Sequence, residues 1–87
     1  MITIFGSDNC FHCLKSKQLC EAMQIEHEFV DVYKDSATFQ RFKELFPDAE
    51  GIPQIMWKGK PVGGYIALTR EIDNYITTVN DEGESDD

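Results

Sequence analysis

Two cysteines separated by two residues, Cys10 and Cys13, follow a short apolar segment at the start of the chain. Residues 2–5 are Ile, Thr, Ile and Phe, which is typical of a buried strand, and residues 6–9 have the composition of a loop. A helical pattern begins at Cys10, so the first thiol is expected at a helix N-terminus, where unpaired N–H groups and the helix dipole stabilise negative charge. Because the thiolate is the nucleophile in disulfide exchange, the motif predicts a redox-active pair.

We expect different roles for the two thiols. The first residue of the helix projects from its end, which favours Cys10 as the attacking thiol, whereas Cys13 lies one turn further on and faces inward as the resolving thiol. Two interpretations of His12 are open: an imidazolium that stabilises the thiolate, or a solvent-exposed spacer. The nearby carboxylate of Asp8 acts in the opposite direction, because it disfavours a thiolate.

The remaining cysteine and the second histidine are expected to be structural. Cys20 is about 10 Å from Cys13 along the helix axis, too far for a disulfide or a shared metal ion, so core packing is its expected role. His27 stands at the start of a predicted strand and is expected at the surface or a sheet edge. No metal site is predicted.

The chain has 87 residues, enough for one small domain, and three cysteines, an odd number that argues against a disulfide-stapled secreted scaffold. It has no apolar run of the roughly 18–20 residues that span a bilayer, and its first residues do not read as an export signal, so a cytoplasmic location is expected. Residues 80–87 hold 5 of the 16 acidic residues and are predicted to form a disordered tail after a domain at 1–79. The domain retains a formal charge of only −3, so we expect neither nucleic acid nor membrane as a partner, and we expect a monomer.

Periodicity along the domain predicts the order β-α-β-α-β-β-α. The predicted strands are residues 2–5, 28–32, 53–57 and 61–62, and the predicted helices are residues 11–24, 36–46 and a segment that follows 63–64. The first strand–helix–strand unit favours parallel pairing, and the final hairpin adds two antiparallel strands. The fold class is therefore α/β: a four-stranded mixed sheet with three helices, which cover both faces.

Two backbone features join the cysteines as candidates for the site. Proline at the start of a strand, as in Ile52-Pro53, is usually a boundary signal; a cis bond there would instead expose the Ile52 backbone to an extended substrate. Gly63-Gly64 before the last helix offers bare backbone where a carboxylate can bind, although a plain strand-to-helix turn explains it equally.

Together these elements resemble the glutaredoxin family, a branch of the thioredoxin fold, across nearly all of residues 1–79. The family's C-P-Y-C, T-V-P and G-G motifs correspond to Cys10–Cys13, Gly51–Pro53 and Gly63-Gly64. The resemblance implies a thiol–disulfide oxidoreductase of the thioredoxin/glutaredoxin fold, with glutathione as co-substrate and a cis Ile52-Pro53 bond.

The resemblance also implies where substrates bind. The backbone of Ile52 would pair with the peptide of glutathione, and the backbone at Tyr65 and Ile66, after Gly64, would receive its γ-glutamyl carboxylate. Partners implied in this way are glutathione and a protein disulfide, such as that of ribonucleotide reductase, with glutathione or a thioredoxin-reductase-like enzyme as reductant. The alternative function is an iron–sulfur module in which two subunits each offer Cys10 together with glutathione.

This chain departs from the family pattern at several positions. Ser7 replaces the usual Lys or Arg three residues before the first cysteine, and Ile66 and Ala67 stand where an acidic residue usually holds the amine of glutathione. Arg41 is a candidate for the missing cation, from the second helix. A protein disulfide could therefore replace glutathione as the main substrate.

Overall fold

The computed structural model describes residues 1–85, with side chains to Thr77, and contains the predicted order of elements. The strands are β1 (Ile2–Gly6), β2 (His27–Asp31), β3 (Gln54–Trp57) and β4 (Lys60–Gly63). The helices are α1 (Phe11–Ala22), α2 (Ser36–Leu45) and α3 (Tyr65–Ser85). No helix among residues 1–85 is long and apolar enough to cross a membrane.

The four strands form one mixed sheet in the order β2-β1-β3-β4. Strand β1 pairs parallel with β2, from Ile2 opposite His27 to Gly6 opposite Asp31, and antiparallel with β3. Strand β4 extends the sheet as the antiparallel partner of β3. The predicted four-stranded mixed sheet with three helices is therefore confirmed.

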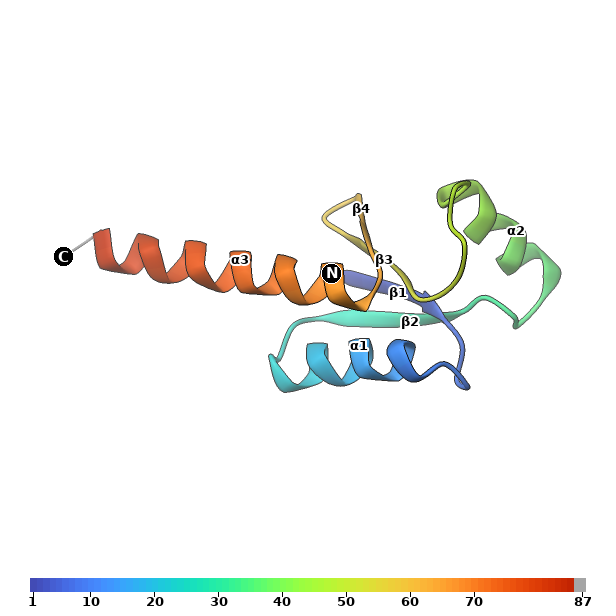
Figure 1. The fold of residues 1–87 in the computed structure, drawn as a ribbon, viewed down its shortest axis with the longest axis horizontal. Helices are drawn as coiled ribbons and strands as arrows, with labels where there is room; N and C mark the ends of the chain where they lie inside the picture. Colours follow the sequence, from blue (N-terminus) through green and yellow to red (C-terminus); the bar gives the residue numbers. More distant parts are fainter. Residues whose placement is uncertain (86–87) are drawn as a thin grey trace.

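Alternation along β1 divides the core into two clusters, because successive side chains of a strand point to opposite faces. Ile2 and Ile4 pack on one face with Cys20 of α1 and with side chains of α3. Phe5 points to the other face and packs with Phe42 of α2. Helices therefore cover both faces of the sheet, with α1 and α3 side by side on one face and α2 near the other (Figure 1).

The helices begin where their capping residues predict. Asp35 caps α2, since its Oδ1 accepts a hydrogen bond of 2.7 Å from the backbone N–H of Thr38. The predicted apolar stripes are only partly buried: in α2, Phe42 is buried but Phe39 and Leu45 are exposed. Periodicity identifies the inward side of a helix, but it does not show how much of that side a small sheet can cover.

The hairpin between β3 and β4 turns at Lys58-Gly59, where both residues have positive φ (56° and 76°). Two successive positive φ angles define the tight turn that matches the twist of paired strands, and glycine adopts this conformation without strain. The predicted turn at residues 58–60 is therefore confirmed.

Helix α3 includes residues 80–85, for which the sequence predicts a disordered acidic tail. The side chains of residues 78–87 and the backbone of 86–87 lie outside the described part of the chain. The tail therefore stays a prediction. Within the described part of α3, Leu68 and Ile72 are buried against the sheet.

Candidate active site

Cys10 is the N-cap residue of α1, as the sequence predicts. Its backbone is extended, and its sulfur accepts a hydrogen bond of 3.2 Å from the backbone N–H of Cys13. The Cys10 carbonyl accepts the first helical hydrogen bond, from Leu14 at 3.1 Å. The helix thus directs an N–H donor at the sulfur, an arrangement that stabilises negative charge there.

Cys13 lies directly behind Cys10 and is completely buried. Burial raises the pKa of the Cys13 thiol to about 12, and its hydrogen bond with Cys10 adds to the rise. Cys13 therefore stays protonated at neutral pH, so any thiolate in this pair belongs to the partly exposed Cys10.

The space for the Cys13 side chain exists because residue 6 is glycine. A Cβ on Gly6 would lie 2.4 Å from Sγ and 2.9 Å from Cβ of Cys13. The end of β1 and the first turn of α1 therefore approach each other more closely than a side chain would permit. The sequence motif alone did not reveal this contact.

The loop before β3 brings Ile52 to the sulfur of Cys10. The thiol of Cys10 donates to the carbonyl of Ile52 across 3.9 Å, and the Ile52-Pro53 peptide bond is cis, as the family resemblance implies. Pairing between β1 and β3 ends at Gln54, so the backbone of Ile52 lies just outside the sheet. An extended chain could add to the sheet at this edge.

A cavity of about 790 Å³ opens beside this loop, within the size range of ligand sites. It is lined by residues 45–54 and 64–67 together with His12 and Pro61. We call this cavity the Ile52 groove. Cys10 does not line it but borders it through Ile52, so a substrate disulfide at Cys10 would extend into the groove.

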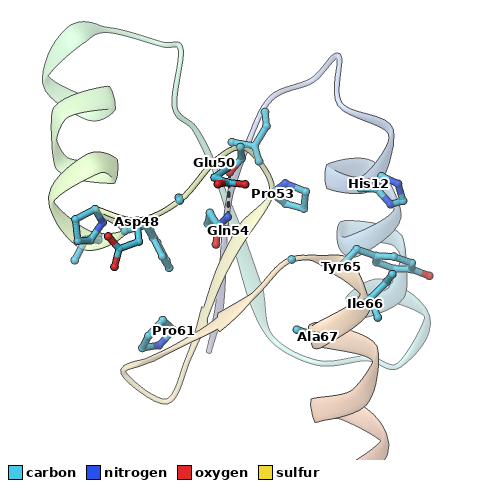
Figure 2. A pocket seen from close by; sticks show the side chains of 16 residues that line it. His12, Asp48, Glu50, Pro53, Gln54, Pro61, Tyr65, Ile66 and Ala67 are labelled. Atoms are coloured by element: carbon cyan, nitrogen blue, oxygen red, sulfur yellow. Dashed lines mark hydrogen bonds between the residues drawn. The ribbon is translucent and has the colours of Figure 1, made fainter.

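His12 lies on the α1 side of the groove (Figure 2), so the structure does not leave it as an isolated spacer. Its ring centroid is 5.8 Å from that of Tyr65 at the start of α3, and 5.6 Å from that of Phe11. The ring of His12 therefore packs between those of Phe11 and Tyr65, next to the cysteines.

The start of α3 forms the adjoining wall. The backbone N–H of Leu68 donates to the Gly64 carbonyl at 3.0 Å, so the earlier N–H groups of Tyr65 and Ile66 have no partner within the helix. Gly64 lies close to Pro53, since a Cβ on it would stand 3.7 Å from the Pro53 carbonyl oxygen. The structure thus brings Ile52, Pro53 and residues 64–66 to one cavity, as the site hypothesis requires.

The sequence analysis did not identify the charged residues of the groove. Asp48 and Glu50, from the loop after α2, line it, and no Lys or Arg does. Arg41 lines a separate cavity with Glu28 and Thr38, so the expectation that it supplies a cation to this site is wrong. One signal could have identified Asp48 and Glu50 from the sequence. The resemblance places Ile52-Pro53 beside the thiols, so the loop that leads into this pair must lie near the site as well.

Cys20 and His27 have structural roles, as expected. Cys20 is buried in the core with Ile4 and Leu68. The Nδ1 atom of His27 forms a 2.8 Å hydrogen bond with the Ile25 carbonyl. Within the described residues, no group of three or more His, Cys, Asp or Glu side chains is arranged to hold a metal ion.

Comparison with known proteins places this geometry in a family. The glutaredoxin family model matches residues 2–62. A glutaredoxin of Haemophilus influenzae is 29% identical over 79 residues, which covers 80% of this chain and 91% of that protein.

Solved structures agree on the fold. Reduced Escherichia coli glutaredoxin matches with a TM-score of 0.74 at 22% identity, covering 87% of this chain and 96% of that one. A buckwheat glutaredoxin–glutathione complex matches with a TM-score of 0.71 at 14% identity (84% and 68% covered), and the glutaredoxin-like NrdH-redoxin of Escherichia coli with 0.63 at 17% identity (74% and 82% covered). The chain therefore belongs to the glutaredoxin family of thiol–disulfide oxidoreductases.

Proposed function

We propose that this protein reduces disulfides by a two-thiol reaction in which Cys10 attacks and Cys13 resolves. The observation that carries the proposal is the asymmetry of the pair. Cys10 is partly exposed and accepts an N–H hydrogen bond at a helix N-terminus, whereas Cys13 is buried and its pKa is raised to about 12. An attacking thiolate needs to be accessible and stabilised by a hydrogen-bond donor, as Cys10 is. A resolving thiol can stay buried and protonated until the mixed disulfide has formed, as Cys13 is.

In the first step, the Cys10 thiolate attacks one sulfur of the substrate disulfide. A bond forms between Cys10 and that sulfur, and the other substrate sulfur leaves as a thiolate. In the second step, Cys13 attacks the Cys10 sulfur and releases the first substrate sulfur, which takes up the Cys13 proton. The substrate gains two electrons and one proton from the enzyme, the thiolate released in the first step takes its proton from solvent, and the enzyme is left with a Cys10–Cys13 disulfide.

The substrate would be held by the Ile52 groove. An extended segment next to the substrate cysteine pairs with the Ile52 backbone beside Pro53, and the free N–H groups of Tyr65 and Ile66 donate hydrogen bonds to a carboxylate or a carbonyl oxygen. His12 contributes the wall opposite Ile52. These roles are supported by the convergence of the residues on one cavity that borders Cys10.

Two classes of substrate and two reductants are compatible with this chemistry. The substrates are protein disulfides, of which ribonucleotide reductase is one candidate, and mixed disulfides of glutathione. Glutathione binds the buckwheat relative, and NrdH-redoxin is described by a thioredoxin-like activity profile, so either glutathione or a thioredoxin reductase could regenerate the dithiol. The expected compartment is the cytoplasm, where thiols stay reduced.

Serine variants test the mechanism. Cys10→Ser should abolish reduction of insulin with thioredoxin reductase and of a glutathione mixed disulfide with glutathione and its reductase. Cys13→Ser should block insulin reduction and accumulate a mixed disulfide on Cys10, while it retains one-thiol reduction of the glutathione mixed disulfide. Cys20→Ala serves as the matched control because Cys20 is buried in the core away from this site. Full insulin turnover by Cys13→Ser would refute the resolving role.

The same assays separate this function from iron–sulfur cluster binding. A cluster bridged by Cys10 from two subunits would give visible absorption after anaerobic purification and a dimer on gel filtration. Disulfide reduction by a colourless monomer supports the oxidoreductase instead.

A further inference from the structure

The charged side chains that line the Ile52 groove on its α2 side are both negative. Asp48 and Glu50 are both exposed, both belong to the loop between α2 and Ile52, and both line the groove (Figure 2). None of its lining residues is Lys or Arg. Among the side chains that the structure describes, those of residues 1–77, no salt bridge joins either carboxylate to a cationic group.

Two cationic side chains that contact neighbouring segments, Lys43 and Lys15, lie outside the lining of the groove. The ammonium of Lys43 is held 3.4 Å from the carbonyl of Ala49, on the loop that carries the carboxylates. Lys15 lies above the ring of Phe11, with Nζ 5.5 Å from its centroid. Of the lining side chains only the imidazole of His12 can become positive, and it packs against Tyr65 on the opposite wall.

The two ends of the groove therefore differ. At the start of α3, free N–H groups favour an anion or a carbonyl oxygen, and the first turn of this helix contains no acidic residue. Toward α2, Asp48 and Glu50 favour a cation. Glutathione carries two carboxylates and one ammonium, so only one of its carboxylates has a favourable place in this groove, and the other adds to the negative charge.

The exposed apolar side chains near Cys10 favour a larger partner. Phe11, which follows Cys10, is 68% exposed, and Ile66, on the groove wall, is 66% exposed. Large apolar side chains that stay in solvent next to a reactive group are typical of a surface that another protein covers.

The geometry points to a protein disulfide flanked by basic residues as the preferred substrate, with Asp48 and Glu50 as the residues that determine this preference. The inference rests on the proposed disulfide exchange at Cys10. A Lys or Arg near the substrate cysteine would lie in the carboxylate end of the groove while the neighbouring backbone pairs with Ile52. Glutathione is then the poorer substrate.

Three disulfide-linked peptides of equal length test this, with Lys, Gln or Glu on both sides of the cysteine. Basic neighbours also change the intrinsic reactivity of a disulfide, so each kcat/KM is divided by the rate of the same peptide with dithiothreitol. We expect the normalised kcat/KM to follow Lys > Gln > Glu, with a Lys-to-Glu ratio that shrinks in high salt. Asp48→Asn and Glu50→Gln should each lower this ratio by about threefold, which lies within the range for an exposed charge pair.

Asp73→Asn is the matched control, because Asp73 is exposed on α3 and does not line the groove. It removes the same charge from the protein and should leave the ratio unchanged. A wild-type ratio near one, or a ratio that survives the double Asp48→Asn, Glu50→Gln variant, would overturn the inference. Failure of the wild type to reduce even the Gln peptide would instead overturn the proposed function, so the two outcomes are distinguishable.

Discussion

Replacing Gly6 by alanine should displace the resolving cysteine and destabilise the fold. The added methyl would lie 2.4 Å from Sγ of Cys13, whereas unstrained contacts between non-bonded heavy atoms are about 3.5–4.0 Å. Rotation about χ1 of Cys13 can move the sulfur, but it leaves the Cβ of that residue at 2.9 Å from the new methyl. Either β1 or the first turn of α1 must therefore move.

Overpacking of this kind costs about 1–3 kcal/mol. Gly6 does not have a positive φ, so alanine fits the backbone, and the lower entropy of the unfolded chain returns about 0.4–1 kcal/mol. We expect a net loss of about 1–2 kcal/mol, and each kcal/mol lowers Tm by about 4–8 °C in a domain of this size. Gly51→Ala is the control, because a Cβ there meets nothing within 4 Å.

Urea unfolding under reducing conditions measures the stability, with the fluorescence of Trp57 as the signal. Stopped-flow release of product from the Cys10 mixed disulfide measures the resolving step, which should slow in Gly6→Ala because Cys13 no longer lies against Gly6. Equal stability and equal resolving rates for Gly6→Ala and Gly51→Ala would refute the close approach that the structure describes.

Three further predictions concern single groups. Cys20→Ser should lower the free energy of unfolding by about 1–3 kcal/mol in urea titrations, because it places a hydroxyl in an apolar core, and should leave disulfide reduction intact. The N–H of Thr38 holds the pKa of Asp35 below its usual range, so the stability that this carboxylate contributes is present above the usual pKa and is lost as pH falls through the lowered pKa. Asp35→Ala should therefore lower Tm at neutral pH and make Tm fall less steeply in acid, as differential scanning calorimetry can show. The raised pKa of Cys13 has the opposite effect on the pH dependence: the stability that this thiol contributes is complete below pH 9 and falls as pH rises toward 12. The urea midpoint of the wild type should therefore decrease with alkaline pH more steeply than that of Cys13→Ala.

The sequence predicts much of this fold because its local signals agree with its tertiary contacts. The apolar run of residues 2–5 forms β1 with both faces buried, and the loop that follows ends at an N-capping Cys10. Lys58-Gly59 turns the hairpin where the pattern predicts a turn. Each of these features depends mainly on residues within a few positions along the chain.

The groove could not be predicted in the same way, because its walls come from segments far apart in sequence. Nothing in the pattern around Asp48 or Glu50 shows that they face Tyr65 across a cavity. The expectation for Arg41 was wrong for this reason: helical periodicity places a residue on one side of α2 but does not show which cavity that side meets. The contact of Gly6 with Cys13 likewise depends on the packing of a strand end on a helix.

The central claim is that Cys10 is the accessible nucleophile and Cys13 its buried, protonated partner. The most direct measurement is the rate at which iodoacetamide alkylates each cysteine of the reduced, folded protein near neutral pH, followed by peptide mass spectrometry. The account predicts that Cys10 is modified first, and that Cys13 and Cys20 react only after denaturation, because both are buried. Modification of Cys13 at a rate equal to or faster than that of Cys10 in the folded protein would contradict it.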